Sequence, residues 1–184
     1  SYTDKNILED INLDIYQGDF LLITGPNGGG KTSLLRTILR LQSPTKGQIT
    51  FFRQGEPVSS LDMGYLPQKN SIDSRFPITV EEVVASGLMG NTQKGNTKFD
   101  SKKEIDEMLD LMGITALRNK PIGVLSGGQL QRSLFGRALI SKPEMLILDE
   151  PASYIDRQFG NRMFEILRDL SSNGTTIMMV SHEI

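Results

Sequence analysis

A glycine-rich run near the start of the chain has the spacing of a phosphate-binding loop. It fits the pattern G-x-x-x-x-G-K-[ST], with fixed positions at Gly25, Gly30, Lys31 and Thr32. Glycines let such a loop wind tightly, so that successive backbone N–H groups point at phosphate oxygens. The lysine would neutralise the terminal phosphates, and the threonine hydroxyl would be a ligand for Mg²⁺. The predicted loop comprises Gly25, Pro26, Asn27, Gly28, Gly29, Gly30, Lys31, Thr32 and Ser33.

The elements on either side of this loop agree with a phosphate site. Residues 20–23 are short and apolar, which is typical of a buried strand. Residues 33–41 carry apolar side chains at helical spacing, which predicts a helix packed on a sheet. The helix would add the positive end of its dipole to the site. A glycine-rich turn beside a surface lysine is the alternative, and it would not require this order of strand, loop and helix.

Two carboxylates follow a second apolar strand, predicted at 145–148. In a parallel sheet, ligands bind beyond the carboxyl ends of the strands, so we expect Asp149 and Glu150 to meet the glycine-rich loop. Asp149 would then hold Mg²⁺, usually through water, and Glu150 would polarise an attacking water as general base. Taken alone, the pair is also consistent with two solvated charges on a loop.

Strands and helices are predicted to alternate along most of the chain. Capping boxes at Thr79-x-x-Glu82 and Ser101-x-x-Glu104 predict the starts of two helices. This pattern favours an α/β fold with a mostly parallel sheet covered on both faces, and a helical insertion at about 71–140. The other predicted helices are 129–140 and 157–172, and the other predicted strands are 11–15, 48–52, 63–66 and 175–180.

Composition limits the function classes. The chain has 184 residues, enough for one domain, and its formal net charge of −2 lacks the basic field of a nucleic-acid surface. We therefore predict no nucleic-acid partner. The sequence contains no cysteine and a single histidine, His182, which excludes thiolate sites and clusters of histidines within one chain. No apolar run has the length needed to span a bilayer.

A second glycine pair opens the helix predicted at 129–140. Leu125-Ser-Gly-Gly-Gln129 would form another anion-binding helix N-terminus. Together with the loop at 25–33 (Walker A) and the run at 145–150 (Walker B), this LSGGQ signature resembles the nucleotide-binding domain of an ABC transporter. The order and spacing of the motifs match across essentially the whole chain.

The resemblance implies a fold and two cofactors. The fold is a P-loop NTPase-type sheet with an ABC-type helical insertion and an N-terminal antiparallel β portion. The chain would be a single ABC ATPase domain over 1–184, truncated at both ends. Its core would comprise 1–70 and 141–184, and its helical subdomain about 71–140. The implied cofactors are ATP and Mg²⁺.

The resemblance also implies roles for single residues. Gln68 matches the glutamine that contacts Mg²⁺ near the membrane partner, and Tyr2 the aromatic residue that stacks on adenine. Asp156 matches the aspartate of the D-loop, and His182 the switch histidine at the γ-phosphate. A capping or core histidine is the alternative for His182. The implied catalytic residues are Glu150, His182 and Gln68, and the implied Mg²⁺ ligands are Thr32, Gln68 and Asp149. Ala152 and Tyr154 depart from the family pattern.

In this family two copies pack head to tail, with ATP between the Walker A motif of one copy and the signature of the other. The resemblance therefore implies an ATP-dependent homodimer. It also implies that the chain lies peripherally at the cytoplasmic face of the cell membrane, bound to an integral-membrane permease, with a solute-binding protein in the full system. The residues that would complete the site in trans are Ser126, Gly127, Gly128 and Gln129.

The transported cargo is predicted from two local resemblances. The segment 73–83 and the triple glycine at 28–30 resemble the ATPase subunits of zinc and manganese uptake systems. Phe76-Pro77-Ile78 is alternatively a hydrophobic staple before a capped helix. Iron chelates, cobalamin and other cargoes are alternatives, as is an ABC ATPase that acts outside transport. A regulatory module that binds ATP without turnover would not need both Glu150 and His182.

Overall fold

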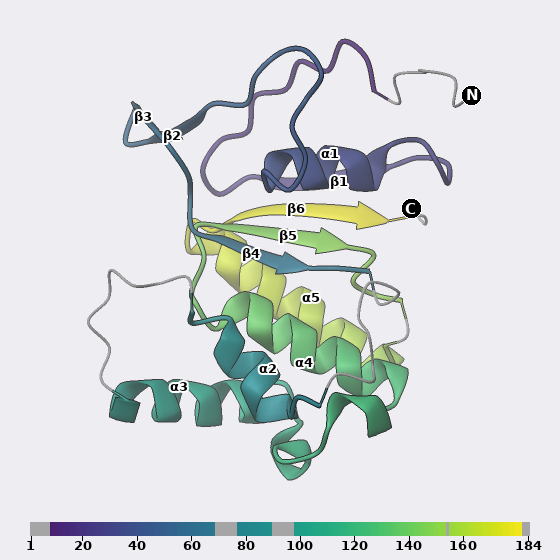
Figure 1. The fold of residues 1–184 in the computed structure, drawn as a ribbon, viewed down its shortest axis with the longest axis vertical. Helices are drawn as coiled ribbons and strands as arrows, with labels where there is room; N and C mark the ends of the chain where they lie inside the picture. The colour runs from purple at the N-terminus through teal and green to yellow at the C-terminus, as the bar shows by residue number, and fades with distance from the viewer. Residues whose placement is uncertain (1–7, 69–76, 90–97, 154, 182–184) are drawn as a thin grey trace.

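The computed structural model describes residues 8–68, 77–89, 98–153 and 155–181. Tyr2, Tyr154, His182 and the first part of the 73–83 segment lie outside these described residues. The centre of the fold is a four-stranded parallel sheet in the order β1-β6-β5-β4 (Figure 1). Its strands are β1 (Phe20–Thr24), β4 (Met63–Leu66), β5 (Met145–Asp149) and β6 (Thr176–Ser181).

The two middle strands, β5 and β6, form the apolar centre of the sheet. Every residue of β5 is buried, and along β6 only the last residue is partly exposed. Alternate side chains supply two separate apolar clusters, because a strand points successive residues to opposite faces. Met178 and Val180 pack on one face, and Ile177 and Met179 on the other. This continuous apolar pattern is typical of a parallel sheet covered on both sides.

Helices cover both faces of the sheet, as predicted. α1 (Lys31–Ile38) lies on one face, and α4 (Gly127–Leu139) and α5 (Arg157–Ser172) lie on the opposite face (Figure 1). The predicted bounds of α5 agree with the structure. Asp156 caps this helix by accepting a hydrogen bond from the Phe159 N–H at 2.9 Å.

Two predictions about strands are wrong. No strand forms at 11–15 among the described residues, where the Ile11 side chain is 53% exposed. An isolated amphipathic segment needs a neighbouring strand edge, and none of the described strands pairs with this one.

β1 is also less buried than its apolar sequence predicts. It lies at the end of the strand order, and Phe20 and Leu22 face outward at 42% and 46% exposure.

An antiparallel hairpin forms beside the main sheet. β2 (Phe51–Arg53), within and just beyond the strand predicted at 48–52, pairs with β3 (Glu56–Val58). The turn between them has positive φ at Gln54 and Gly55, as a tight hairpin requires. Arg53 donates two hydrogen bonds to the carboxylate of Glu144, at 2.8 and 2.5 Å, which fastens the hairpin to the start of β5. The pKa of Glu144 is lowered chiefly by this contact.

A group of helices fills the segment between β4 and β5. α2 (Val80–Ser86) begins at the predicted Thr79–Glu82 capping box, in which each side chain bonds the other residue's N–H. The hydrogen bonds that the Glu82 carboxylate accepts from the Thr79 N–H and from the Thr79 hydroxyl lower the pKa of Glu82. α3 (Lys98–Leu111) begins before Ser101, so the second predicted capping box is wrong. Two short 3₁₀ turns follow α3, η2 (Thr115–Leu117) and η3 (Ile122–Val124).

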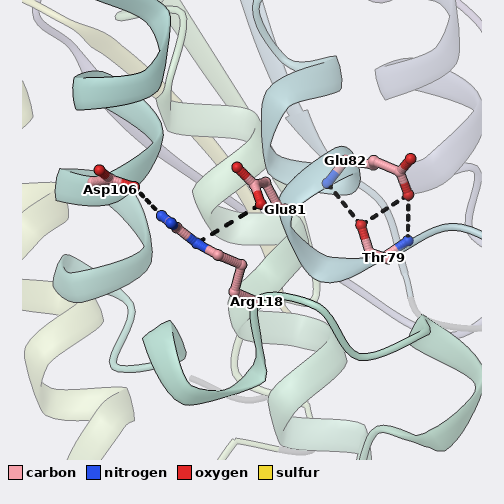
Figure 2. Close-up of polar contacts among 5 residues, drawn as sticks. All are labelled: Thr79, Glu81, Glu82, Asp106 and Arg118. Atoms are coloured by element: carbon pink, nitrogen blue, oxygen red, sulfur yellow. Dashed lines mark hydrogen bonds and ion pairs between the residues drawn. The ribbon is translucent and has the colours of Figure 1, made fainter.

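Arg118 fastens α2 to α3. Its guanidinium forms an ion pair with Asp106 of α3 and lies 3.8 Å from the carboxylate of Glu81 on α2 (Figure 2). The cation therefore lies between two acidic side chains on separate helices. Because the Arg118 side chain is only about a quarter exposed, water screens the charges of this cluster less than those of an ordinary surface ion pair.

The backbone of α4 approaches β4 and the end of α2 very closely. A Cβ atom at Gly64 of β4 would lie 2.1 Å from the carbonyl oxygen of Ala138, and one at Gly87 would lie 2.1 Å from that of Arg137. Real Cβ atoms do not approach backbone oxygens this closely, so the two glycines permit the packing of α4.

We predict that Gly64→Ala lowers the free energy of unfolding by about 2 kcal/mol or more, because the added methyl would clash with backbone. Gly160→Ala is the matched control, since its Cβ would meet nothing within 4 Å on α5 and alanine favours a helix. Urea denaturation of the three proteins measures both effects. Equal stability of Gly64→Ala and the unmodified chain would contradict the close approach.

Candidate nucleotide site

The predicted phosphate loop and the predicted carboxylates meet in the structure. The Thr32 hydroxyl donates a hydrogen bond of 3.1 Å to Oδ2 of Asp149, across 117 positions of sequence. The meeting follows from topology, because β1 and β5 run parallel on either side of β6 and end at the same edge of the sheet.

The loop before α1 encloses the ammonium group of Lys31. Lys31 Nζ donates to the carbonyl oxygens of Gly25 at 2.7 Å and Pro26 at 2.9 Å, and the side chain is only 9% exposed. Gly28 and Gly30 adopt φ of 79° and 85°, a region that favours glycine and lets the loop fold back on the lysine. The loop thus concentrates positive charge at the start of α1.

The first turn of α1 suits an anion. Gly30 is its N-cap residue and provides no side-chain cap, and the turn contains no acidic residue. The N–H groups at a helix start have no partner within the helix and carry the positive end of its dipole. Together with the nearby ammonium, they form a concave donor surface of the kind that binds phosphate.

Asp149 is a carboxylate buried to 1% exposure at the end of β5. Burial raises its pKa, and the hydrogen bond from Thr32 offsets part of this effect. Its second oxygen, Oδ1, is buried without a hydrogen-bond partner among the described residues. A buried, unpaired carboxylate oxygen beside a hydroxyl fits Mg²⁺, which prefers oxygen ligands and would offset the buried charge.

Glu150 and Gln68 lie together at the ends of neighbouring strands. Gln68 Nε2 donates a hydrogen bond of 3.0 Å to Oε2 of Glu150. The Glu150 backbone has φ of 54°, which is uncommon for a residue with a side chain, and its N–H donates to the carbonyl of Val180 at 3.0 Å. Backbone of this kind is frequent at functional sites. The structure therefore brings these two predicted catalytic residues into contact.

The signature residues form the first turn of α4. Ser126 Oγ accepts from the N–H of Gln129 at 3.3 Å, and the Gln129 side-chain oxygen accepts from the N–H of Ser126 at 3.0 Å. This capping box, which the sequence analysis did not predict, starts the helix at Gly127 rather than at 129. It leaves the serine hydroxyl hydrogen available to an outside acceptor. No hydrogen bond or ion pair between described residues joins this turn to the loop at 25–33.

Asp156 caps α5 and contacts α4. Its second carboxylate oxygen accepts from Arg132 at 2.5 Å. The hydrogen bond from the Phe159 N–H and the bond from Arg132 lower its pKa. Arg132 and its neighbour Gln131 were missed by motif reasoning. The sequence offered no distinguishing signal, because the same helix also carries Gln129, Ser133 and Arg137.

Fold and site together are those of a P-loop nucleotide-binding domain. The sequence pattern of the ABC transporter family matches residues 8–153. This chain belongs to that family.

Known proteins give the same result. The chain is 42% identical to a probable metal transport system ATP-binding protein of Chlamydia pneumoniae, over 97% of this chain and 74% of that protein. It is 35% identical to the zinc import ATP-binding protein ZnuC of Haemophilus influenzae, over 100% of this chain and 63% of that protein. A solved dimeric cassette, MJ0796 bound to ADP and Pi, superposes with a TM-score of 0.82 at 27% identity, over 96% of this chain and 80% of that one.

Among the described residues, no helix combines the length and apolar character that a membrane span requires. Within the same residues, no group of three or more His, Cys, Asp or Glu side chains is arranged to hold a metal ion.

We predict that Asp149→Asn stabilises the chain in the absence of Mg²⁺ by about 1 kcal/mol at neutral pH, because it removes a buried charge. Burial raises the pKa of Asp149, so the folded state binds its proton more tightly than the unfolded state does. The free energy of unfolding therefore falls as pH rises through that pKa, and the advantage of asparagine disappears in acid.

Urea denaturation in EDTA at acidic and neutral pH measures this difference, with the exposed Asp110→Asn of α3 as control. If Asp149→Asn has a lower free energy of unfolding than the unmodified chain at neutral pH, the buried charge does not destabilise the fold and the prediction is wrong.

Proposed function

We propose that this chain is the ATP-binding and ATP-hydrolysing subunit of an ABC transporter that imports zinc or manganese through a separate permease. The observation that carries the proposal is the contact between Thr32 and Asp149 beside the buried Lys31. It unites a phosphate-binding helix start with a carboxylate suited to Mg²⁺. The two relatives, one named for metal transport and one for zinc import, support the cargo.

Binding would place the triphosphate against the first turn of α1. The N–H groups of the loop and the Lys31 ammonium would replace the water that solvates the phosphates, and Tyr2 would stack on adenine. Lys31 would exchange its carbonyl partners for phosphate oxygens, which are stronger acceptors because they are charged. Mg²⁺, held by Thr32, Asp149 and Gln68, would neutralise charge that develops on the phosphates.

Hydrolysis would use Glu150 as the general base. Its carboxylate would accept a proton from water as the water oxygen bonds to the γ-phosphorus, and the bond from that phosphorus to the bridging oxygen of ADP would break. Gln68 and the unusual backbone at Glu150 orient the carboxylate. His182 would contact the γ-phosphate.

A second copy would complete the site. Ser126, Gly127, Gly128 and Gln129 would meet the γ-phosphate bound to the partner's loop. The capping box supports this role, because it uses the N–H groups of Ser126 and Gln129 but leaves the Ser126 hydroxyl hydrogen and the N–H groups of Gly127 and Gly128 available. The dimeric cassette with ADP and Pi supports the arrangement. ATP would favour the closed dimer because it contacts both copies, and hydrolysis would release it.

The dimer would act on a permease at the cytoplasmic face of the membrane. The surface around Gln68 and the segment 73–83 would dock on it, and a solute-binding protein would deliver the metal. Asp156 would contribute to the contact between copies.

We expect Glu150→Gln to abolish turnover, lowering kcat at least about 100-fold, while ATP remains bound and holds a dimer. Phosphate release and size-exclusion chromatography with ATP measure the two effects. The exposed Glu165→Gln of α5 serves as the control variant. Continued fast hydrolysis by Glu150→Gln would show that Glu150 is not the general base.

Lys31→Ala is expected to weaken ATP binding by a factor of about 10 or more, because it removes a charge-assisted contact worth roughly 1.5–3 kcal/mol. A fluorescent ATP analogue measures the affinity, and Lys102→Ala, an exposed change on α3, controls for loss of charge. Unchanged affinity in Lys31→Ala would refute the role of the loop.

The cargo is tested by co-purifying the chain with its permease and measuring metal uptake into vesicles. We expect ATP-dependent uptake of zinc or manganese that Glu150→Gln abolishes. Uptake of an iron chelate or cobalamin instead would correct the cargo and leave the ATPase assignment intact.

A further inference from the structure

Helix α4 holds both ends of the connection between β5 and α5. Gln131 is 1% exposed, and its Nε2 lies 3.4 Å from the carbonyl oxygen of Pro151, the residue after Glu150. Arg132 donates a hydrogen bond of 2.5 Å to Asp156, at the start of α5. Its guanidinium also lies over the ring of Phe159, 4.3 Å from the centroid.

These contacts come from the helix whose first turn is the signature. Gln131 and Arg132 lie about 8–9 Å along the helix axis from Ser126, at 1.5 Å per residue. Groups this close on one regular helix move together. A displacement of Ser126 would therefore reach Pro151 and Asp156, and through Pro151 the backbone of Glu150.

The chemistry of Arg132 suits a positioning role better than a stabilising one. Its side chain is 24% exposed and that of Asp156 is 55% exposed, and ion pairs this accessible add little to stability. A planar guanidinium can, however, bind a carboxylate edge-on and stack on an aromatic ring at once, which a lysine cannot do equally well. The contacts with Asp156 and with the Phe159 ring fix both the position and the orientation of the Arg132 guanidinium.

Gln131 gives independent support. Its Oε1 is buried without a hydrogen-bond partner among the described residues, so the amide is retained at an energetic cost. The contact that this buried amide makes is with Pro151. Two adjacent residues of α4 thus bind opposite ends of the same connection.

We propose that Arg132 is a positioning residue that couples the signature turn to the orientation of Glu150. It acts through Asp156 and Phe159, and Gln131 assists through Pro151. When a γ-phosphate binds Ser126, helix α4 would then fix the position of the connection between β5 and α5, which begins at Glu150. This inference rests on the proposed ATPase function.

The test compares Arg132→Gln and Arg132→Lys in the full chain. We expect kcat for ATP to fall about 10- to 100-fold in Arg132→Gln, because small misplacement of a catalytic group is costly. KM and the affinity for a fluorescent ATP analogue should stay unchanged, since the phosphate loop is untouched. Arg132→Lys should restore part of kcat, because it keeps the charge and loses the stacking. Melting temperatures verify that each variant is folded.

Arg137→Gln is the matched control. Arg137 lies on the same helix but donates to Ser86 of α2 at 3.1 Å, away from the connection, so its loss should leave kcat unchanged. Phe159→Leu completes a double-mutant cycle, in which the effects of Arg132→Gln and Phe159→Leu on kcat should not add.

The outcomes separate this inference from the proposed function. If the unmodified chain hydrolyses ATP and Arg132→Gln retains its kcat, the positioning role is overturned and the ATPase assignment stands. If Arg132→Gln raises KM instead of lowering kcat, the residue serves nucleotide binding and the inference is also overturned. Absence of ATP turnover in the unmodified chain would overturn the proposed function, and this inference with it.

Discussion

The hydrogen bond between Thr32 and Asp149 is the contact on which the rest of the site depends. It joins the start of α1 to the end of β5 and requires that β1, β6 and β5 run parallel and end together. It also places a carboxylate in the apolar core with one oxygen satisfied and the other without a partner in the described part of the chain. Such burial costs free energy, and a bound cation is what would offset it.

Around this contact, backbone geometry adds to side-chain pairing in positioning the polar groups of the site. Positive φ at Gly28 and Gly30 turns the loop over Lys31, and positive φ at Glu150, the proposed base, turns the chain away from the line of β5. The capping box on α4 fixes the hydroxyl of Ser126 without using its hydrogen. A site built this way has donors and a base already in position before a ligand arrives, which lowers the reorganisation that binding and catalysis require.

Sequence reasoning succeeded where a motif and a periodic pattern agreed. The bounds of α5 and the capping box at Thr79 followed from local rules, and the meeting of Thr32 with Asp149 followed from the rule that parallel strands end at the same edge of a sheet. It failed where the outcome depends on a distant partner: the segment 11–15 has the pattern of a strand but no strand edge in the described structure to join. Ser101 has the spacing of a cap, yet α3 starts before it. The contacts of Gln131 and Arg132 needed three-dimensional proximity, because no motif pairs α4 with the start of α5. The roles assigned to Tyr2 and His182 remain predictions.

The near-contact of backbones at Gly64 and Gly87 also constrains how α4 can move. At its C-terminal end the helix rests directly against β4 and the end of α2, with the backbone of one element close to that of the other. Sliding along its axis would drive the carbonyl oxygens of Arg137 and Ala138 into the neighbouring backbone, so this end of the helix is held in place. The end of α4 at Arg137 and Ala138 is therefore its most constrained part. A tilt about this end would displace the opposite end of the helix most, and that end carries Ser126 and the signature.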